Sequence, residues 1–241
     1  MRNISLILFL TIMSCSTDKK VVTLRIENEQ IYFVDSTNTV MNYNYNSSES
    51  RSKSENIITY VISNETDKKL LFIIDKKIYP SVEKELTISG STYFVIKDKV
   101  GEIKKYNMPL VSFDREVNSN KIYSDSIKNN YYNKIGVENK NIDYVANLFE
   151  NSIIIGPGER KTFKAIVNFP IISEINSKQG INPLYYRGLK DAENFQIYYS
   201  CNAKSLMSCL PKYVRNELND NEVEIFEGII ESNEVPLKLV K

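Results

Sequence analysis

The stretch that decides the fold runs from Asn56 to Ile74 and reads NIITYVISNETDKKLLFII. Residues 56–62 and 70–74 are apolar runs rich in isoleucine and in other β-branched or aromatic residues. Runs of this kind favour β-strands. The residues between them, 63–69, are polar and include asparagine, threonine and aspartate, which favour turns. The stretch therefore predicts two β-strands joined as a hairpin.

Short runs of the same kind lie on both sides of this stretch. A second hairpin is predicted from Val21–Ile26 and Ile31–Val34, and a third from Thr92–Ile96 and Ile103–Met108, which turns through Lys97–Gly101. Residues 152–155 and 161–169 predict a strand on each side of the turn Gly156–Glu159. Further strands are predicted over 195–200, 222–231 and 235–240.

Two segments have apolar residues at helical spacing. They are 141–150 and 211–218, and Pro211 stands at a plausible first-turn position of the second. Two other segments, 37–55 and 114–141, are polar, and the first is rich in serine and asparagine. We interpret 37–55 as a linker or exposed loop and 114–141 as a long loop.

Many short strands with polar turns and one or two helices are typical of a mainly β fold, an antiparallel β-sandwich with one or two short helical insertions. The 56–74 hairpin and the pattern I-x-G-P-G-E-x-K-x-F at 154–163 resemble strand–turn patterns of immunoglobulin-like domains in secreted bacterial proteins. The resemblance implies an immunoglobulin-like sandwich. We expect it to span 21–241, with a possible division within the 114–141 loop.

The composition excludes several classes of protein. The chain has 241 residues, of which 42% are hydrophobic and 25% charged, so whole-chain disorder and a fibrous repeat are excluded. The 31 basic residues nearly balance the 30 acidic ones, which gives no reason to expect a nucleic acid partner. The chain has no histidine. A Ser-His-Asp or Cys-His nucleophile system and a His-ligated zinc ion are therefore excluded.

The first 15 residues have the pattern of a bacterial export signal. A positive start at Met1–Asn3 precedes an apolar run, Ile4–Met13, that is too short to span a membrane. The run ends in Ile12-Met13-Ser14-Cys15, which resembles the lipobox of bacterial lipoproteins. The resemblance implies cleavage before Cys15 and lipidation of its thiol and new amine; an ordinary signal peptide with an incidental cysteine is the alternative. The implied anchor is lipid, because several acyl chains hold a protein on a membrane stably.

The residues after Cys15 bear on localisation. Lipoproteins of the Bacteroidota type that reach the cell surface tend to carry an acidic run there, whereas this chain has Asp18 followed by Lys19 and Lys20. We therefore expect an outer-membrane lipoprotein that faces the periplasm, and surface exposure stays open. The predicted organisation is a signal peptide over 1–14, a lipidated cysteine and tether over 15–20, and the β-sandwich.

Cys201 and Cys209 are the other two cysteines. An exported protein meets an oxidising compartment, which favours a disulfide between them. Two reduced buried cysteines, or a functional thiol or metal pair, are the alternatives. Two cysteines without histidine provide half of a zinc site at best.

Tyrosines occur in close pairs, and two of these pairs lie in predicted loops. Tyrosine combines a rigid flat ring with a hydroxyl group and is suited to stacking on a sugar or anchoring a protein interface. We therefore predict ligand binding by the loop tyrosines Tyr43, Tyr45, Tyr131 and Tyr132. Packing at the solvent edge is the alternative. Adjacent residues of a strand point to opposite faces, so Tyr198 and Tyr199 are not expected to form one platform, and one of them should lie in the core.

Carboxylates could in principle support glycoside hydrolysis without histidine. Asp114, Glu116, Asp143 and Glu150 lie near predicted loops, but no pattern selects a pair. The run Asn219–Glu222 has oxygen ligands of the kind calcium prefers but lacks the spacing of a calcium loop, and Gly156–Gly158 lacks the features of a phosphate loop. We predict no catalytic residue, no metal and no cofactor.

The sequence therefore predicts a lipid-anchored cell-envelope protein that acts as a non-enzymatic module for binding a protein or another ligand. One alternative is an enzyme that processes envelope carbohydrate or peptide with carboxylates. Another is a structural assembly component whose exposed sheet edge pairs with another chain. The expected contacts are the membrane, through the lipid anchor at Cys15, and an envelope protein.

Overall fold

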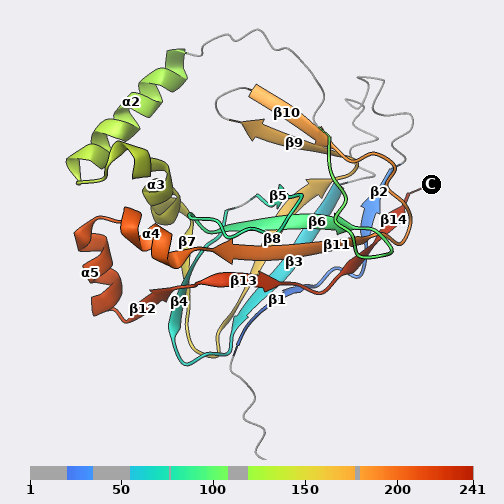
Figure 1. Ribbon diagram of the computed structural model, residues 1–241, viewed down its shortest axis with the longest axis horizontal. Coiled ribbons are helices and arrows are strands. Elements are labelled where there is room, and N and C mark those ends of the chain that lie inside the picture. Colours follow the sequence, from blue (N-terminus) through green and yellow to red (C-terminus); the bar gives the residue numbers. More distant parts are fainter. Residues whose placement is uncertain (1–20, 35–54, 76, 108–118, 177–179, 241) are drawn as a thin grey trace, which may run out of the picture.

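The computed structural model of the protein describes residues 21–34, 55–75, 77–107, 119–176 and 180–240. Of these residues, 41% lie in strands and 23% in helices, so the predicted mainly β fold is confirmed and is compatible with a β-sandwich. Figure 1 shows the strands forming the body of the molecule and the helices gathered at one end of it.

Two of the sheets have three strands each. The first, called here the β3 sheet, has the order β1 (Val22–Ile26), β3 (Glu55–Asn64) and β8 (Arg160–Asn168), all antiparallel. The second, the β4 sheet, has the order β12 (Val223–Ile225), β4 (Lys69–Ile73) and β7 (Ser152–Ile155). In the β4 sheet, β12 runs parallel to β4 and β7 antiparallel to it.

The largest sheet, called here the β11 sheet, is built around β11 (Asn194–Cys201) and β6 (Ser91–Lys97). Its other strands are β2 (Ile31–Phe33), β14 (Val235–Leu239), β13 (Gly228–Glu231) and β5 (Tyr79–Pro80). The β2–β14 and β5–β6 pairs are parallel, so the sheets are mixed rather than purely antiparallel. A separate hairpin consists of β9 (Ile171–Asn176) and β10 (Gly180–Tyr185).

Aromatic rings fill the core in two groups. One surrounds Phe94, whose ring centroid lies 5.1–6.4 Å from those of Phe169, Tyr186 and Phe195. The other surrounds Phe72, which lies 5.1 Å from Phe226 and 5.3 Å from Tyr199. These rings come from strands and loops far apart in the sequence, so their packing ties the sheets together.

Four α-helices and one 3-10 turn occur among the described residues, rather than one or two insertions. The predicted helices are confirmed as α3 (Ile142–Asn151) and α5 (Lys212–Asp220), the latter preceded by Pro211. Further helices are α4 (Ala203–Cys209) and the 3-10 turn η2 (Asn139–Asn141). The loop predicted over 114–141 is wrong for most of its length, because α2 (Ser119–Lys134) occupies it.

The hairpin predicted from residues 56–74 is also wrong, although both of its strands exist. β3 pairs with β1 and β8, whereas β4 pairs with β12 and β7, so the polar segment between β3 and β4 joins two different sheets. The turn Gly156–Glu159 also joins two sheets, because it connects β7 of the β4 sheet to β8 of the β3 sheet. We call these two connections, 65–68 and 156–159, the corners, and they lie next to each other.

Asn64 holds these two corners together. Its buried side-chain amide donates to the carbonyl oxygens of Lys68 (2.7 Å), Ile155 (2.8 Å) and Gly156 (3.2 Å), and its side-chain oxygen accepts from the Thr66 amide at 3.0 Å. The Asn64 backbone bonds to the second corner as well, donating to Glu159 O and accepting from Gly158 N. A polar residue in a core position therefore replaces the strand pairing that a hairpin would have supplied.

The hairpin predicted from Val21–Ile26 and Ile31–Val34 is wrong for the same reason. β1 pairs with β3, while β2 pairs with β14 near the chain's carboxyl end. Asn56 fixes this separation, because its side chain accepts from Tyr32 N at 2.7 Å and donates to Tyr32 O at 2.8 Å. The Asn56 side chain thus makes the two hydrogen bonds to Tyr32 that the backbone of a neighbouring strand would otherwise make.

Two further predictions need smaller corrections. Residues 103–108 were expected to form a strand against β6, but within the described part of this segment the pairing with β6 is a single bridge between Lys97 and Ile103. The strand expected over 222–231 is divided into β12 and β13, because Phe226 leaves the strand path to stack on Phe72. The strand expected over 195–200 is confirmed as β11.

Candidate binding surface

Four aromatic residues on three helices form a group that we call the aromatic patch. It consists of Tyr131 and Tyr132 from α2, Phe149 from α3 and Tyr213 from α5. Tyr131 is 58% exposed, Tyr213 46% and Phe149 42%, whereas Tyr132 is 7% exposed. The patch thus has three accessible rings around a buried one.

Ring contacts order the patch. The centroids of Tyr131 and Tyr132 are 5.3 Å apart in an edge-on arrangement, and Tyr132 stacks on Phe149 with centroids 6.2 Å apart. Burial raises the pKa of Tyr132, and the neighbouring Glu150, Tyr131 and Tyr213 raise it further. The pKa of Tyr213 is also raised, by burial first and then by Tyr131 and Glu217. Ring contacts therefore join α2 to α3, while Tyr213 on α5 acts on the patch through its charge.

The helices hold these rings in place through their buried faces. α3 buries Ile142, Val145, Ala146 and Leu148. This leaves Phe149 at the border of its apolar face. α2 ends close after Tyr132: the Tyr132 carbonyl accepts from Val137 N, and Gly136 adopts a positive φ of 84°. An ion pair of 3.3 Å between Lys128 and Asp143 joins α2 to α3.

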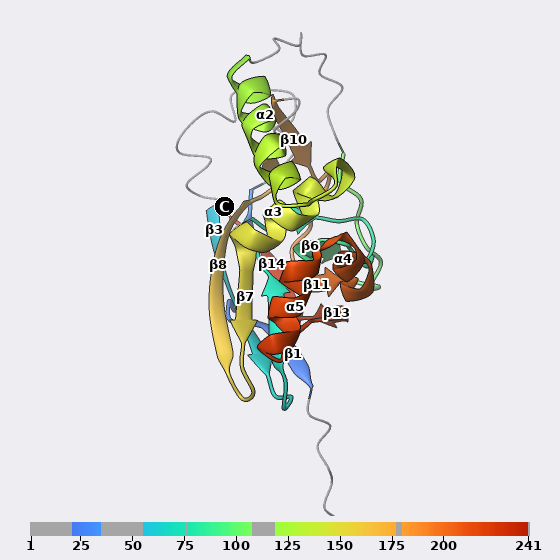
Figure 2. The same ribbon diagram turned by 90° about the vertical axis from the view of Figure 1, so that its left-hand side faces the viewer.

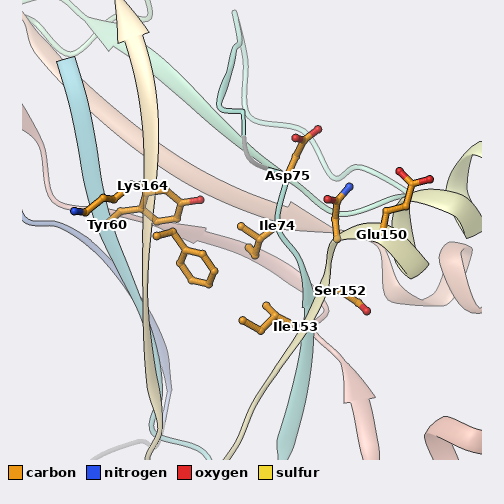
Figure 3. Close-up of a pocket in the computed structure, with 9 residues that line it drawn as sticks. Tyr60, Ile74, Asp75, Glu150, Ser152, Ile153 and Lys164 are labelled. Atoms are coloured by element: carbon orange, nitrogen blue, oxygen red, sulfur yellow. The ribbon is translucent and has the colours of Figure 1, made fainter. Parts of the chain in front are cut away.

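A shallow groove of about 240 Å³ lies on the other side of the α3 carboxyl end. Its floor is formed by Tyr60 and Phe163, stacked with centroids 5.3 Å apart, together with Ile74 and Ile153. Figure 3 shows the side chains of Tyr60, Ile74 and Ile153 directed toward the centre of the groove. The groove therefore lies between β8 and the β4–β7 pair.

The carboxylates near the groove lie at its rim. Asp75 accepts from the Tyr79 hydroxyl at 2.8 Å and from the Lys77 amide at 3.1 Å. The Glu150 side chain is exposed, and Figure 3 shows the carboxylates of Asp75 and Glu150 pointing away from the apolar floor rather than toward each other. The floor is therefore suited to an apolar side chain.

The structure separates the tyrosines that the sequence predicted as a binding surface. Tyr131 is exposed as expected, whereas Tyr132 is buried and supports the patch. Tyr43, Tyr45 and the lipobox residues up to Cys15 lie outside the described residues. Sequence reasoning missed Phe149 and Tyr213. Each stands next to a residue of a buried helical row, Leu148 or Val214, which is the signal that could have identified them.

The other tyrosine pairs belong to the interior. Tyr198 and Tyr199 are 1% and 0% exposed, so both are buried, whereas only one was expected in the core. The reason is that β11 is covered on both faces. The Tyr198 hydroxyl donates to Glu83 O at 2.7 Å, and the Tyr199 hydroxyl accepts from Ile73 N at 3.1 Å.

The expected disulfide is not formed, because Cys201 and Cys209 are both free. Cys201 ends β11 with its side chain buried in the core, where burial raises its pKa to about 12 despite the opposing effect of Tyr199. Cys209 lies at the end of α4, and its thiol donates to Ser205 O at 3.3 Å. The two thiols thus have separate environments.

The remaining candidate residues do not form a site together. Asp143 pairs with Lys128, and Glu150 lies between the aromatic patch and the groove, while Asp114 and Glu116 fall outside the described residues. In 219–222, the Asn221 side chain donates to Glu217 O at 2.7 Å, as at the end of a helix. Within the described ranges, no three histidine, cysteine, aspartate or glutamate residues gather as a metal site.

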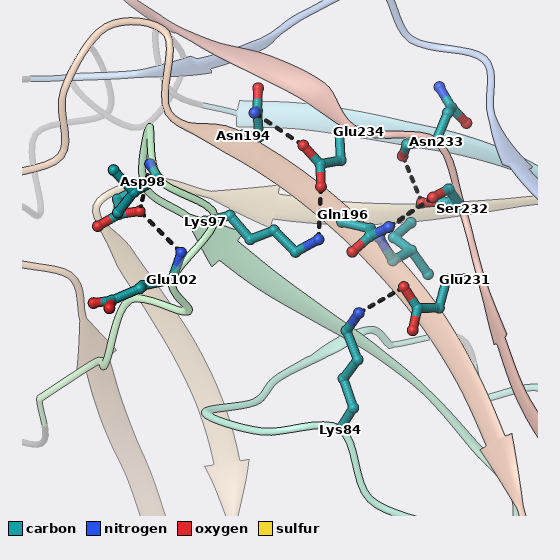
Figure 4. A network of polar contacts seen from close by, with 12 residues as sticks. Lys84, Lys97, Asp98, Glu102, Asn194, Gln196, Glu231, Ser232, Asn233 and Glu234 are labelled. Carbon is teal, nitrogen blue, oxygen red and sulfur yellow. Dashed lines mark hydrogen bonds and ion pairs between the residues drawn. The ribbon is translucent and has the colours of Figure 1, made fainter.

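A set of ion pairs on the β11 sheet has a structural role. Lys97 contacts Glu234 at 2.6 Å, and Asn194 donates to the same carboxylate at 3.0 Å; Lys84 contacts Glu231, also at 2.6 Å (Figure 4). Ser232 lies between them and accepts from Ile197 N at 3.0 Å. These contacts attach β13 and β14 to the middle of the sheet.

Comparison of the chain with protein families, with curated proteins and with solved structures found no match. Among the described residues, none of the helices has the length and apolar character needed to cross a membrane.

Proposed function

We propose that this protein is a lipid-anchored, non-enzymatic module of the cell envelope that binds another protein through the aromatic patch. The observation that carries the proposal is that the exposed rings of Tyr131 on α2 and Phe149 on α3 both pack against the buried Tyr132. Tyr213 adds an exposed ring on α5. Exposed aromatic residues on a rigid support are the usual anchors of protein interfaces.

The chemistry around the patch favours a particular kind of partner surface. Glu150 follows Phe149 in α3, and Glu217 lies one helical turn after Tyr213 in α5, so carboxylates border these rings. An arginine or lysine of the partner would meet both an aromatic face and a negative charge there. Because the rings are held by helix packing, little side-chain entropy would be lost on binding.

Cross-linking tests the binding proposal. A photoreactive amino acid is placed at Tyr131, or as a matched control at Val100, which is 81% exposed in a different part of the molecule. The full chain is expressed in its own envelope and irradiated. We expect a reproducible cross-linked protein from position 131 that is absent from position 100. Equal labelling at both positions would contradict the proposal.

A substitution tests the same surface quantitatively. Tyr131→Ala removes an exposed ring and should weaken binding of the cross-linked partner by about tenfold or more, as for an interface anchor. The thermal midpoint should change little, because the ring is largely exposed. Unchanged binding in Tyr131→Ala and in Tyr213→Ala would exclude the patch as the interface.

The anchoring part of the proposal rests on the lipobox-like sequence Ile12–Cys15. Cys15→Ser should abolish lipidation and outer-membrane association and leave the signal uncleaved, because the acyl chains are added to that thiol. Fractionation of envelopes, with mass spectrometry of the amino-terminal peptide, checks both effects. Continued association of Cys15→Ser with the outer membrane would contradict lipid anchoring but leave the patch proposal standing.

A further inference from the structure

The strand β8 is the edge of the β3 sheet. It is nine residues long and pairs along its whole length with β3, whereas no described strand pairs with its other side. Figure 2 shows β8 along the outer margin of the molecule. Long edge strands of this kind expose backbone groups that can pair with a further chain.

The register identifies the exposed backbone groups. Thr59 of β3 directs its carbonyl oxygen to Glu27 N at 2.9 Å and its amide to Asn28 Oδ1 at 2.8 Å, both on the side away from β8. Thr59 lies opposite Lys164, so this pair is not hydrogen-bonded in the β3–β8 ladder. Lys164 therefore directs its own N–H and C=O outward, and by alternation so do Thr162 and Ile166.

The apolar groove lies beside this edge. Phe163 is half-buried on the inner face of β8, and its ring forms the groove floor with Tyr60, Ile74 and Ile153. A strand added to β8 would alternate its side chains between the two faces of the sheet. Residues opposite Phe163 would therefore point toward the groove, and residues opposite Lys164 would point to the outer face.

The outer face of β8 is basic. Arg160 and Lys164 lie on it two positions either side of Thr162 and are both exposed, whereas Lys161 is paired with Glu159. An antiparallel second copy would gather four of these cations on one face of two adjacent strands, which is unfavourable. Charge therefore favours a partner strand that carries acidic residues on that face.

We propose that β8 accepts an extended, acidic segment of another protein as an added strand. The segment alternates apolar residues, which enter the groove beside Phe163, with carboxylates, which lie beside Arg160 and Lys164. Main-chain hydrogen bonds to Thr162 and Lys164 supply the affinity, and the alternation supplies the specificity. This surface is distinct from the aromatic patch and does not depend on it.

The test uses the full-length protein and synthetic nine-residue peptides. The probe alternates valine with glutamate and has phenylalanine at the centre. One control peptide has lysine in place of glutamate, and a second is N-methylated at the amides that would donate to β8. Binding is measured by fluorescence anisotropy, and sedimentation of the protein alone detects self-association.

Four results are expected. The glutamate peptide binds, and both N-methylation and replacement by lysine weaken its binding by about tenfold or more. Thr162→Pro weakens binding of the glutamate peptide, because it removes an outward N–H that the β3 ladder does not use. The double variant Arg160→Glu/Lys164→Glu prefers the lysine peptide, and this reversal cannot arise from misfolding. Lys212→Glu, an exposed charge change on α5, leaves binding unchanged.

Several outcomes would overturn the proposal. No binding of the glutamate peptide, equal binding of its N-methylated form, or equal binding of the lysine peptide would each do so. Self-association that is abolished by Thr162→Pro would assign the edge to a second copy instead. Binding of anionic vesicles that depends on Arg160 and Lys164, without peptide binding, would assign the face to a membrane.

Discussion

Strands β11 and β8 are of similar length but are used in opposite ways. Seven of the eight residues of β11 are buried, and it is paired with β6 on one side and with β13 and β14 on the other. β8 is paired on one side, and two of its nine residues are buried. The comparison teaches that stability is concentrated in β11, which leaves β8 available for recognition.

The sequences of the two strands agree with this division. β11 reads NFQIYYSC and has no charged residue, whereas β8 reads RKTFKAIVN and has three. A charged side chain in a strand that is covered on both faces would be buried without a partner of opposite charge, which is unfavourable. The cations of β8 also discourage unwanted pairing along its open edge.

Removing the same side chain from each strand should produce the largest contrast. Ile197 in β11 is fully buried, and Ile166 in β8 is 64% exposed. Ile197→Ala should lower the free energy of unfolding by about 2–5 kcal/mol, because it leaves a cavity in the core. Ile166→Ala should change it by about 0.5 kcal/mol or less. Urea unfolding measures both values, and equal losses would refute the division of roles.

The sequence predicted individual strands better than their partners. β11 was predicted to within one residue at each end because its apolar run is bounded by polar residues. The hairpins failed because adjacent strands such as β3 and β4 enter different sheets. The buried Asn64 makes that crossing possible, and an asparagine within a polar turn has the same sequence signal in a hairpin.

The aromatic patch could be predicted only in part. Tyr131 was selected correctly as an exposed ring, but it was placed in a loop. α2 was missed because its sequence has no clear apolar face, so its position depends on tertiary contacts such as Tyr132 against Phe149. The packing of α2 against α3 could not be predicted because it arises from contacts between separate segments, such as Lys128 with Asp143.

The corner before β8 offers the second-largest effect. Asn64→Ala leaves the carbonyl oxygens of Lys68, Ile155 and Gly156 without their shared donor, which should cost about 3 kcal/mol. Because the corner holds β8 more than β11, hydrogen exchange should accelerate in β7 and β8 before it does in β11. Asn221→Ala, which removes an exposed hydrogen bond to Glu217 O on α5, is the control. Uniform acceleration would mean that the corner supports the whole core.

An alkaline titration gives the third effect, centred on Tyr60, which β8 covers through Phe163. Burial raises the pKa of Tyr60 to about 12; the nearby Thr92 hydroxyl opposes this rise, and the charge of Asp75 adds to it. The pKa is higher in the folded state than its usual value of 10, so the associated stability is present below pH 10 and is lost between pH 10 and pH 12.

Tyr60→Phe removes this titrating group. Between neutral pH and pH 12, the free energy of unfolding of the variant should rise relative to that of the wild type by about 2–3 kcal/mol. Urea unfolding at a series of pH values measures the gain. Tyr131→Phe, which changes an exposed ring, is the control. If the free energy of unfolding changes by the same amount in Tyr60→Phe and in Tyr131→Phe, then Phe163 and β8 do not shield the Tyr60 hydroxyl from water in solution.

The smallest expected effect is the difference between two ion pairs, one on the β11 sheet and one on the β3 sheet. Lys97 and Glu234, on the β11 sheet, have side chains that are 15% and 40% exposed, and Asn194 also holds the carboxylate. Arg25 and Glu27, at the end of β1, are 73% and 44% exposed and 3.5 Å apart. Water screens the second pair more, and its longer contact needs two mobile side chains to be fixed.

Double-mutant cycles with alanine should therefore give about 1 kcal/mol of coupling for Lys97–Glu234 and close to zero for Arg25–Glu27. Raising the salt concentration should reduce the first value only slightly, because exposed charges are screened more than half-buried ones. If the two couplings are equal, the charges on the β11 sheet add nothing to its stability, and the contrast with the β3 sheet rests on apolar burial and strand pairing alone.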